Sequence, residues 1–528
     1  MTIRSALIAL FILALLPFSL TSAQEPVTGG ELVVGIRFAD FGTLDPHVTV
    51  LTQAAYVFGH IFETLIYLDA DGNLIPRLAT SWEGSEDSTV WTLHLREGVT
   101  FHDGTPFDAA AVVANFDRMV APETNSGTAG PLMGPYASSE VVDDRTVRVH
   151  FSDAYALFPF ALSSPWIGMV SPTAVETFGD RFDEHLVGTG PFRFVSQTPQ
   201  ISVVLERNPD YAWAPAGFQD GAAYVERLVF RLVLEEATRL ATLETGEALV
   251  IDEVPATRVA SMRDAGQFTV VGAPRLGIAR NNFLNTSLAP TDDLRVRQAL
   301  LYGTDREGLN QAVFRGVYPI AYQVLTPGVR FYTDAYDDMY PYDPERAVEL
   351  LEDAGWTEIN SDGYRVKDGV VLTINHATFA GYVAEAPSEI VQAQLRDIGV
   401  KMDITVIGSG YNDFVTAIDS PYNSALVATY SPDPGLILHR TFLSSNVGVS
   451  NWAFVDDPEL DALLQAGLET SDEDERAQIY DDVQRILQEM AVVVPLYANV
   501  NVFGLNERVN GFRFSAYGHP EFLGVWLD

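Results

Sequence analysis

Side chains able to perform catalysis are present, but they do not fall into the spacings of known catalytic or metal sites. Nine histidines are scattered along the chain, and none is paired as H-x-x-x-H or H-E-x-x-H, which would place two imidazoles on one helical face. The absence of cysteine excludes thiolate ligands and thiol nucleophiles, and no G-x-S-x-G turn for a serine nucleophile occurs. We therefore predict no metal, no cofactor and no catalytic residue.

Two further patterns are weak signals for chemistry. The motif Gly188-Thr189-Gly190-Pro191 lacks the third glycine of a dinucleotide loop, and Pro191 has no N–H to offer a phosphate. We expect Gly188 and Gly190 to supply backbone angles that a side chain would forbid. The 71 acidic residues leave a glycosidase-type carboxylate pair open, although no spacing nominates one. A secreted hydrolase is therefore the alternative from a different functional class.

Composition narrows the partners and the architecture. The 71 acidic residues against 32 Lys and Arg give a formal net charge of −39, which argues against a nucleic-acid partner because phosphates are neutralised by clustered cations. Without cysteine, stability must come from core burial and not from disulfides. The 528 residues exceed what one hydrophobic core usually supports, so two or three domains are expected.

The N-terminus predicts secretion. Arg4 is followed by an apolar run over residues 6–16 and then by the small residues of Thr21-Ser22-Ala23, the pattern of a cleavable signal peptide. The run is shorter than the roughly 20 apolar residues of a spanning helix, and no cysteine is present to carry a lipid anchor. We expect residues 1–23 to be removed and a soluble mature protein to be released into the periplasm.

The remaining chain alternates strand-like and helix-like segments. Residues 91–95 alternate apolar and polar side chains and predict a half-buried strand, and residues 492–497 predict a buried one. A helix is expected from about Glu385 to Ile398. Capping signals predict four more helix starts: Asp108 before Ala109, Asp343 before Pro344, Asp457 before Pro458, and Ser471 with Asp474. These elements predict a mixed α/β fold.

An ordered set of short motifs runs through the whole mature chain. Its members are Gly30-Glu31-Leu32, Leu44-Asp45-Pro46, and residues 61–65, 76–83, 91–99, 101–107, 188–192, 208–211 and 293–300. In this order they resemble the extracellular solute-binding proteins, family 5, of ABC importers, whose members bind peptides, nickel complexes or opines. Each motif is a weak signal alone; the order of the set carries the resemblance.

The resemblance implies a two-lobed periplasmic-binding-protein fold of type II, in its large class with an extra subdomain, that closes about a hinge. The first lobe would combine residues 24–66, 186–280 and 497–528, with residues 67–185 as the extra subdomain and 281–496 as the second lobe. The expected protein is a monomer without enzymatic activity or membrane insertion. It would pass a small peptide-like ligand to the permease subunits of an ABC importer.

The resemblance also nominates ligand-binding residues. Asp433, in Tyr430-Ser431-Pro432-Asp433-Pro434, resembles the position where peptide-binding members hold the ligand's α-ammonium, and a carboxylate suits that charge-assisted contact. The alternative is that Asp433 only caps a turn. Asn451, Trp452 and Trp166 are expected to line the cleft, with core packing as the alternative. Our set of candidate ligand contacts is Asp433, Tyr430, Trp452, Asn451, Trp166, Thr49 and Thr52.

Other ligands are alternatives within the same family. A nickel chelate is disfavoured because Ser164-Pro165-Trp166-Ile167 contains no arginine of the kind that the nickel-binding branch uses, and His439 stands alone near the second-lobe segment. Opines and oligosaccharides are further candidates, and tryptophans would suit sugar stacking. Arg297 either pairs with an acid of its own lobe or contacts the ligand. A chaperone-like periplasmic factor is a third functional class.

Overall fold

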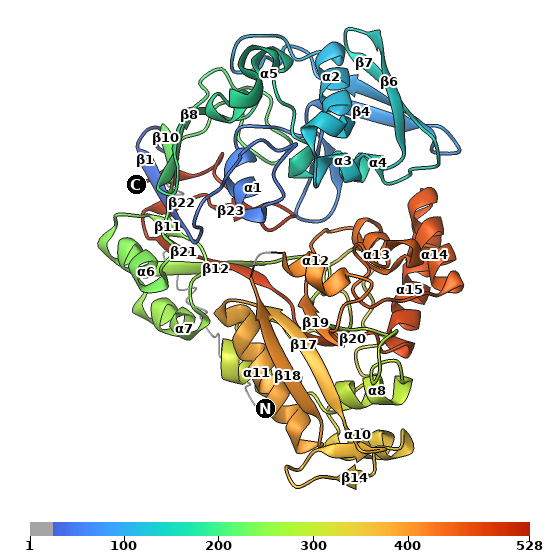
Figure 1. The fold of residues 1–528 in the computed structure, drawn as a ribbon. Coiled ribbons are helices and arrows are strands. Elements are labelled where there is room, and N and C mark those ends of the chain that lie inside the picture. Colours follow the sequence, from blue (N-terminus) through green and yellow to red (C-terminus); the bar gives the residue numbers. More distant parts are fainter. Residues whose placement is uncertain (1–24, 409) are drawn as a thin grey trace, which may run out of the picture.

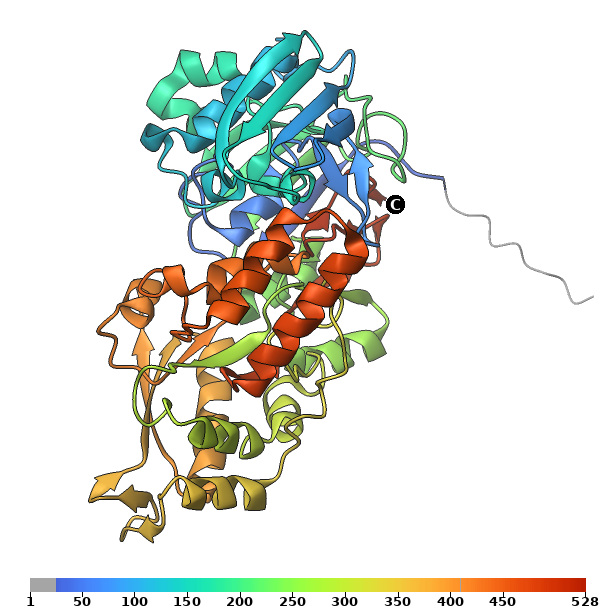
Figure 2. The same ribbon diagram turned by 90° about the vertical axis from the view of Figure 1, so that its right-hand side faces the viewer.

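The computed structural model describes residues 25–408 and 410–528, so the predicted signal peptide lies outside the described residues. Figures 1 and 2 show two parts stacked on each other. The part that contains a seven-stranded and a four-stranded sheet is here called the first lobe, and the part built around a five-stranded sheet is the second lobe. None of the helices in these residue ranges has the length and apolar character needed to cross a membrane.

The seven-stranded sheet of the first lobe collects strands from three distant parts of the chain. Its order is β12-β21-β11-β1-β10-β9-β8, with β1 parallel to both β10 and β11. The bounds are β1 Glu31–Ile36, β8 Phe192–Thr198, β9 Ser202–Arg207, β10 Arg227–Leu232, β11 Val250–Ile251, β12 Phe268–Pro274 and β21 Val500–Asn506. The chain therefore leaves this lobe after β12 and returns to it at β21.

The four-stranded sheet is antiparallel, in the order β4-β5-β7-β6. Its strands are β4 Ala79–Gly84, β5 Val90–Leu95, β6 Tyr136–Asp143 and β7 Thr146–Phe151. The predicted strand over residues 91–95 is confirmed by β5, and α2 (Ala109–Val120) begins where Asp108 accepts a hydrogen bond from the N–H of Ala111. One continuous hydrophobic core joins this sheet to the seven-stranded one.

The second lobe is built on a five-stranded sheet in the order β18-β17-β19-β13-β20. Its strands are β13 Arg280–Leu284, β17 Thr373–Phe379, β18 Lys401–Ile407, β19 Ser424–Val427 and β20 Val493–Tyr497. Leu284 and Leu426 belong to one core cluster, whereas Phe283 and Ala425 belong to another. Because successive side chains of a strand point to opposite faces, these are cores on the two faces of the sheet.

Helices cover both faces. The first of these cores contains residues of α8 (Leu294–Tyr302), α9 (Arg306–Phe314), α10 (Pro344–Asp353) and α11 (Tyr382–Asp397), and the second contains residues of α13 (Pro434–Phe442), α14 (Pro458–Glu469) and α15 (Glu473–Glu489). Asp343 and Asp457 cap α10 and α14 as predicted. The cap of α15 is Asp472 and not Ser471, because the Asp472 carboxylate reaches the N–H of Glu475. The helix predicted from Glu385 begins earlier, at Tyr382.

Gly188 and Gly190 were expected to adopt backbone angles that a side chain would forbid, and this expectation is wrong. Neither has a positive φ. A Cβ at Gly188 would lie 2.1 Å from the carbonyl oxygen of Ile61, and one at Gly190 would lie 2.4 Å from that of His60. These glycines are needed because two backbones approach closely, and the angles themselves are open to any residue.

Two chain segments connect the lobes, between β12 and β13 and between β20 and β21. They run side by side, since the N–H of Arg275 donates to the carbonyl oxygen of Asn499 at 2.8 Å. The lobes also meet far from these crossings, where the N–H of Ala156 donates to the carbonyl oxygen of Leu468 at 3.0 Å. The lobes are thus in contact at the two crossings and again at a distance from them.

Candidate functional site

Two adjoining cavities lie between the lobes, with volumes of about 570 Å³ and about 270 Å³. They share six wall residues: Thr128, Trp166, Thr429, Tyr430, Ser431 and Tyr517. Both lobes contribute to these shared walls, so the two cavities form one space that the lobes enclose together. The larger volume falls in the range of about 300–1,000 Å³ that is typical of ligand pockets.

Apolar and aromatic side chains form most of the larger cavity. Leu132 and Tyr155 face it from the first lobe, and Leu436 and Leu468 face it from the second. Polar side chains enter at the end away from the crossings, where Asp153, His439 and Arg440 line the wall. Apolar walls with a few placed polar groups are typical of sites that hold a small molecule.

The smaller cavity lies at the crossings between the lobes and carries a positive charge. The guanidinium of Arg275 lies over the Tyr430 ring, 3.6 Å from its centroid. The Tyr430 hydroxyl accepts hydrogen bonds from Asn499 Nδ2 and, at 3.4 Å, from Arg280 Nη2. Burial alone would raise the pKa of Tyr430, but the charges of Arg275 and Arg280 and the hydrogen bond from Asn499 bring that pKa below its ordinary value.

Two buried polar atoms in the shared walls have no hydrogen-bond partner among the described residues. They are Trp166 Nε1 and Thr429 Oγ1. Buried polar groups are nearly always hydrogen-bonded in folded proteins. Both atoms therefore suit contacts to polar groups of a bound solute, with Trp166 able only to donate.

The structure brings three of the seven candidate residues into the cavity walls and places four elsewhere. Trp166, Tyr430 and Thr52 line the smaller cavity. Thr49, Asn451, Trp452 and Asp433 are buried residues outside the cavity walls.

Local contacts occupy three of those four side chains. The Thr49 hydroxyl accepts the N–H of Leu51. Asn451 bridges the backbone of Val455 and neighbouring carbonyls, and Trp452 packs edge-on against Phe283 in the core. The core-packing alternative fits the contacts of Asn451 and Trp452.

The Asp433 carboxylate is engaged inside the second lobe. It is fully buried, accepts the N–H of Gly435 at the start of α13, and pairs with Arg476 Nη2 at 2.8 and 3.0 Å. The first contact is a helix cap, and the second is an ion pair within the second lobe. The role of Asp433 as an anchor for a ligand's α-ammonium stays a prediction. Arg297 donates to the backbone carbonyl oxygens of Thr291 and Met490. It forms no ion pair with an acid among the described residues, which was one of the two roles considered for it.

Sequence reasoning missed several wall residues, above all Arg275. The signal available was its position, because Arg275 and Arg280 stand just before the predicted lobe boundary at residue 281, where a cleft would have its base. The chain has more than twice as many acids as cations, so cations at that boundary were worth singling out. Tyr155, Thr429, Ser431, Tyr517 and His519 carried no comparable local signal.

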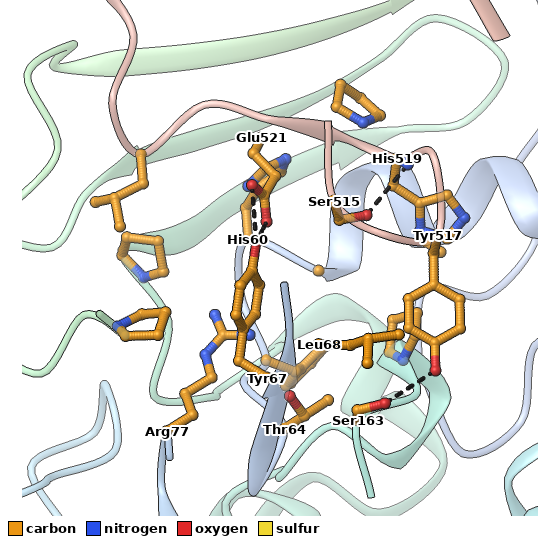
Figure 3. A pocket seen from close by; sticks show the side chains of 18 of the residues that line it. His60, Thr64, Tyr67, Leu68, Arg77, Ser163, Ser515, Tyr517, His519 and Glu521 are labelled. Atoms are coloured by element: carbon orange, nitrogen blue, oxygen red, sulfur yellow. Dashed lines mark hydrogen bonds between the residues drawn. The ribbon is translucent and has the colours of Figure 1, made fainter. Parts of the chain in front are cut away.

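A separate, much smaller cavity of about 80 Å³ lies within the first lobe. Figure 3 shows its polar lining, with the Tyr67 hydroxyl donating to Glu521 at 2.9 Å and the Tyr517 hydroxyl bonded to Ser163 at 3.1 Å. Tyr517 and His519 form a wall between this space and the cavity between the lobes. It has room for a few water molecules and not for a peptide.

Comparison with known proteins identifies the family of this chain. The model of the bacterial extracellular solute-binding proteins, family 5 (middle region), matches residues 73–448. The chain belongs to this family. The family consists of binding proteins that do not catalyse reactions, so the prediction that this solute-binding protein is not an enzyme is confirmed by membership. No group of three or more histidine and acidic side chains in the described residues is arranged to hold a metal ion.

Relatives match this solute-binding protein over nearly its whole length. The glutathione-binding protein GsiB of Salmonella typhimurium is 29% identical over 512 residues, covering 95% of each chain. The structure of NikA from Brucella suis with Fe(III)-EDTA has a TM-score of 0.83 and 26% identity, over 94% of this chain and 100% of NikA. DppA from Helicobacter pylori with the peptide STSA has a TM-score of 0.79 and 25% identity, over 95% and 98%. The predicted mixed α/β binding-protein fold is confirmed.

Proposed function

We propose that this protein captures a small peptide or peptide-like solute in the periplasm and delivers it, as a monomer, to the permease subunits of an ABC importer. The observation that carries the proposal is the cavity between the lobes, whose apolar walls include Trp166 and Tyr430 and enclose about 570 Å³ in the larger part. That volume suits a solute of a few residues. The names of two relatives support this class, since GsiB is a glutathione-binding protein and DppA holds a peptide.

The proposal includes the division of the chain that the sequence predicted. The first lobe would combine residues 24–66, 186–280 and 497–528, with 67–185 as its extra subdomain and 281–496 as the second lobe. The strand membership of the seven-, four- and five-stranded sheets supports these boundaries. The hinge would then lie at the two crossings beside Arg275 and Asn499, and rotation there would open the cavity.

A thermal-melt panel tests the proposal. We expect di- and tripeptides, including glutathione, to raise the melting temperature, with a gain in unfolding free energy of about 2.7 kcal/mol at 100 times Kd. Nickel–histidine and oligosaccharides in the same panel represent the other ligands of the family. Trp166→Ala should weaken the response, and exposed Arg263→Gln serves as the control.

Because a binding protein does not cleave its ligand, we expect mass spectrometry to find the peptide intact after incubation. A panel in which sugars shift the melt and peptides do not would reject the peptide class. A melt that responds only to unfolded polypeptide, without saturation by small ligands, would indicate the chaperone-like class.

A carboxylate-bearing metal chelate is the second candidate. Arg275 in the cavity wall favours it, because a guanidinium can hold a chelator's carboxylates. The structural relative NikA holds such a complex, Fe(III)-EDTA. Isothermal titration with metal-loaded and metal-free chelator separates this candidate from a peptide.

A further inference from the structure

Arg275 is a partly buried cation in the wall of the smaller cavity, whereas Arg440, in the wall of the larger one, is exposed to solvent. The Arg275 side chain makes no hydrogen bond or ion pair with any described residue and is held only by its stacking on the Tyr430 ring. The nearby acids are already engaged, because Asp252 lies 3.4 Å from Arg239 and Glu253 lies 2.8 Å from Arg37. The five N–H donors of this guanidinium therefore have no partner from the described protein.

Arg280 adds a second cation beside the same tyrosine. Its Nη2 donates to the Tyr430 hydroxyl, its Nε is buried without a partner, and its guanidinium lies 5.0 Å from the centroid of the Phe379 ring. No ion pair within the described residues includes Arg280 or Arg275. Other buried arginines without an acid, such as Arg306, instead donate to backbone carbonyls.

Unpaired cations at this place call for an external anion. Arg275 is partly buried, and the Nε of Arg280 is buried. A charge costs free energy to the extent that it loses contact with water, unless an opposite charge or hydrogen-bond acceptors replace the water. The protein has a net charge of −39 and abundant carboxylates, yet no carboxylate in the described part of the chain pairs with these two arginines. Stacking fixes the plane of Arg275 and leaves its N–H edge free for the two-pronged contact that a carboxylate makes.

We infer that Arg275, with Arg280 behind Tyr430, forms a carboxylate subsite at the hinge end of the cavity, and that the captured solute is an anion. Its apolar part would lie along Tyr155, Trp166 and Leu436 in the larger cavity. This inference rests on the proposed function, because it takes the cavity between the lobes as the solute site. The shared chemistry is a carboxylate, supplied either by a peptide or by a metal chelator.

The test compares acids with their uncharged derivatives. Glutathione and its diethyl ester, Leu-Leu and its C-terminal amide, and metal-loaded EDTA are titrated calorimetrically into the wild type, Arg275→Gln, Arg275→Lys and the control Arg263→Gln. We expect each acid that binds to bind at least about tenfold tighter than its derivative in the wild type and the control. Arg275→Gln should abolish that preference, and Arg275→Lys should restore part of it, because lysine keeps the charge without the fork.

A second measurement does not depend on the solute's identity. Citrate should raise the melting temperature of the wild type and of Arg263→Gln above that in sodium chloride of equal ionic strength, and Arg275→Gln should lose this rise. Equal responses of Arg275→Gln and wild type would overturn the subsite, as would acids and derivatives of equal affinity. If no peptide binds but the citrate difference persists, the peptide proposal fails and the anion subsite stands; EDTA binding would then identify a chelate.

Discussion

Two charged residues near the cavity differ in how their charge is satisfied. The Asp433 carboxylate pairs with Arg476 and accepts a hydrogen bond from the first turn of α13. Arg275, among the described residues, contacts only an aromatic ring with its guanidinium. A buried charge that is paired contributes to folding, and one that faces a cavity unpaired is available to a ligand. At the scale of the residue, it is the partner and not the residue type that separates a structural charge from a binding one.

We predict that Asp433→Asn mainly lowers stability. It would leave the buried Arg476 guanidinium without its counter-ion, so the free energy of unfolding in urea should fall by about 3–5 kcal/mol. The affinity for a bound peptide should change less than about threefold. Asp457→Asn is the matched control, since Asp457 caps α14 and has no arginine partner among the described residues. Because asparagine caps a helix about as well as aspartate, this change should cost well under about 1 kcal/mol. A folded Asp433→Asn protein that loses affinity for free but not N-acetylated peptides would establish the ammonium anchor.

At the scale of elements, a glycine-bearing segment supports the helix that brings Thr52 to the cavity. That helix, α1 (Thr52–Phe58), is followed by the backbone of His60 and Ile61. The N–H of Gly190 donates to the carbonyl oxygen of Ile61 at 2.8 Å, and a Cβ at Gly190 would meet two carbonyl oxygens. The close approach of two backbones thus positions part of the cavity wall.

Gly190→Ala should therefore destabilise the protein. The added methyl cannot fit 2.4 Å from the carbonyl oxygen of His60, so one backbone must shift, at a cost of about 1–3 kcal/mol or more in unfolding free energy. Gly408→Ala is the control, because a Cβ there would meet nothing within 4 Å. Equal denaturation midpoints for the two variants would show that this packing is looser than the structure indicates.

At the scale of the whole molecule, net charge and lobe contact act together. A formal charge of −39 opposes any compact state through self-repulsion. The two lobes nevertheless touch, through the crossings and through the bond between Ala156 and Leu468. Closure of the cavity therefore brings together surfaces of a strongly acidic protein, and an anionic solute would need the local positive charge of Arg275.

Salt should consequently stabilise the ligand-free protein. Raising sodium chloride from 0.05 to 1 M shortens the Debye length to about 3 Å and should raise the melting temperature measured by circular dichroism. Arg275→Gln should show the same rise, since the effect comes from the total charge and not from the subsite. A melting temperature that is flat or falls with salt would contradict self-repulsion as a significant cost.

Local signals in the sequence predicted much of the fold. The structure confirms the strand predicted from the alternation at residues 91–95 and the helix caps predicted at Asp108, Asp343 and Asp457. Both kinds of feature depend on residues that are only a few positions apart. The site was predicted only in part. Tyr430 and Trp166, nominated through a family resemblance, line the cavity between the lobes. Trp452 and Asn451 lie outside its walls, because Trp452 packs on the distant Phe283 and Asn451 bonds to the backbone of its own loop.

The sequence by itself determined the family and the mixed α/β class, since these follow from short motifs and from the alternation of strand-like and helix-like segments. Only the tertiary structure decided which charges are free. Asp433 meets Arg476 across 43 positions of sequence, and Arg275 meets no acid at all among the described residues. Whether a charge has a partner depends on distances between residues far apart in the chain, and neither spacing nor composition contains that information.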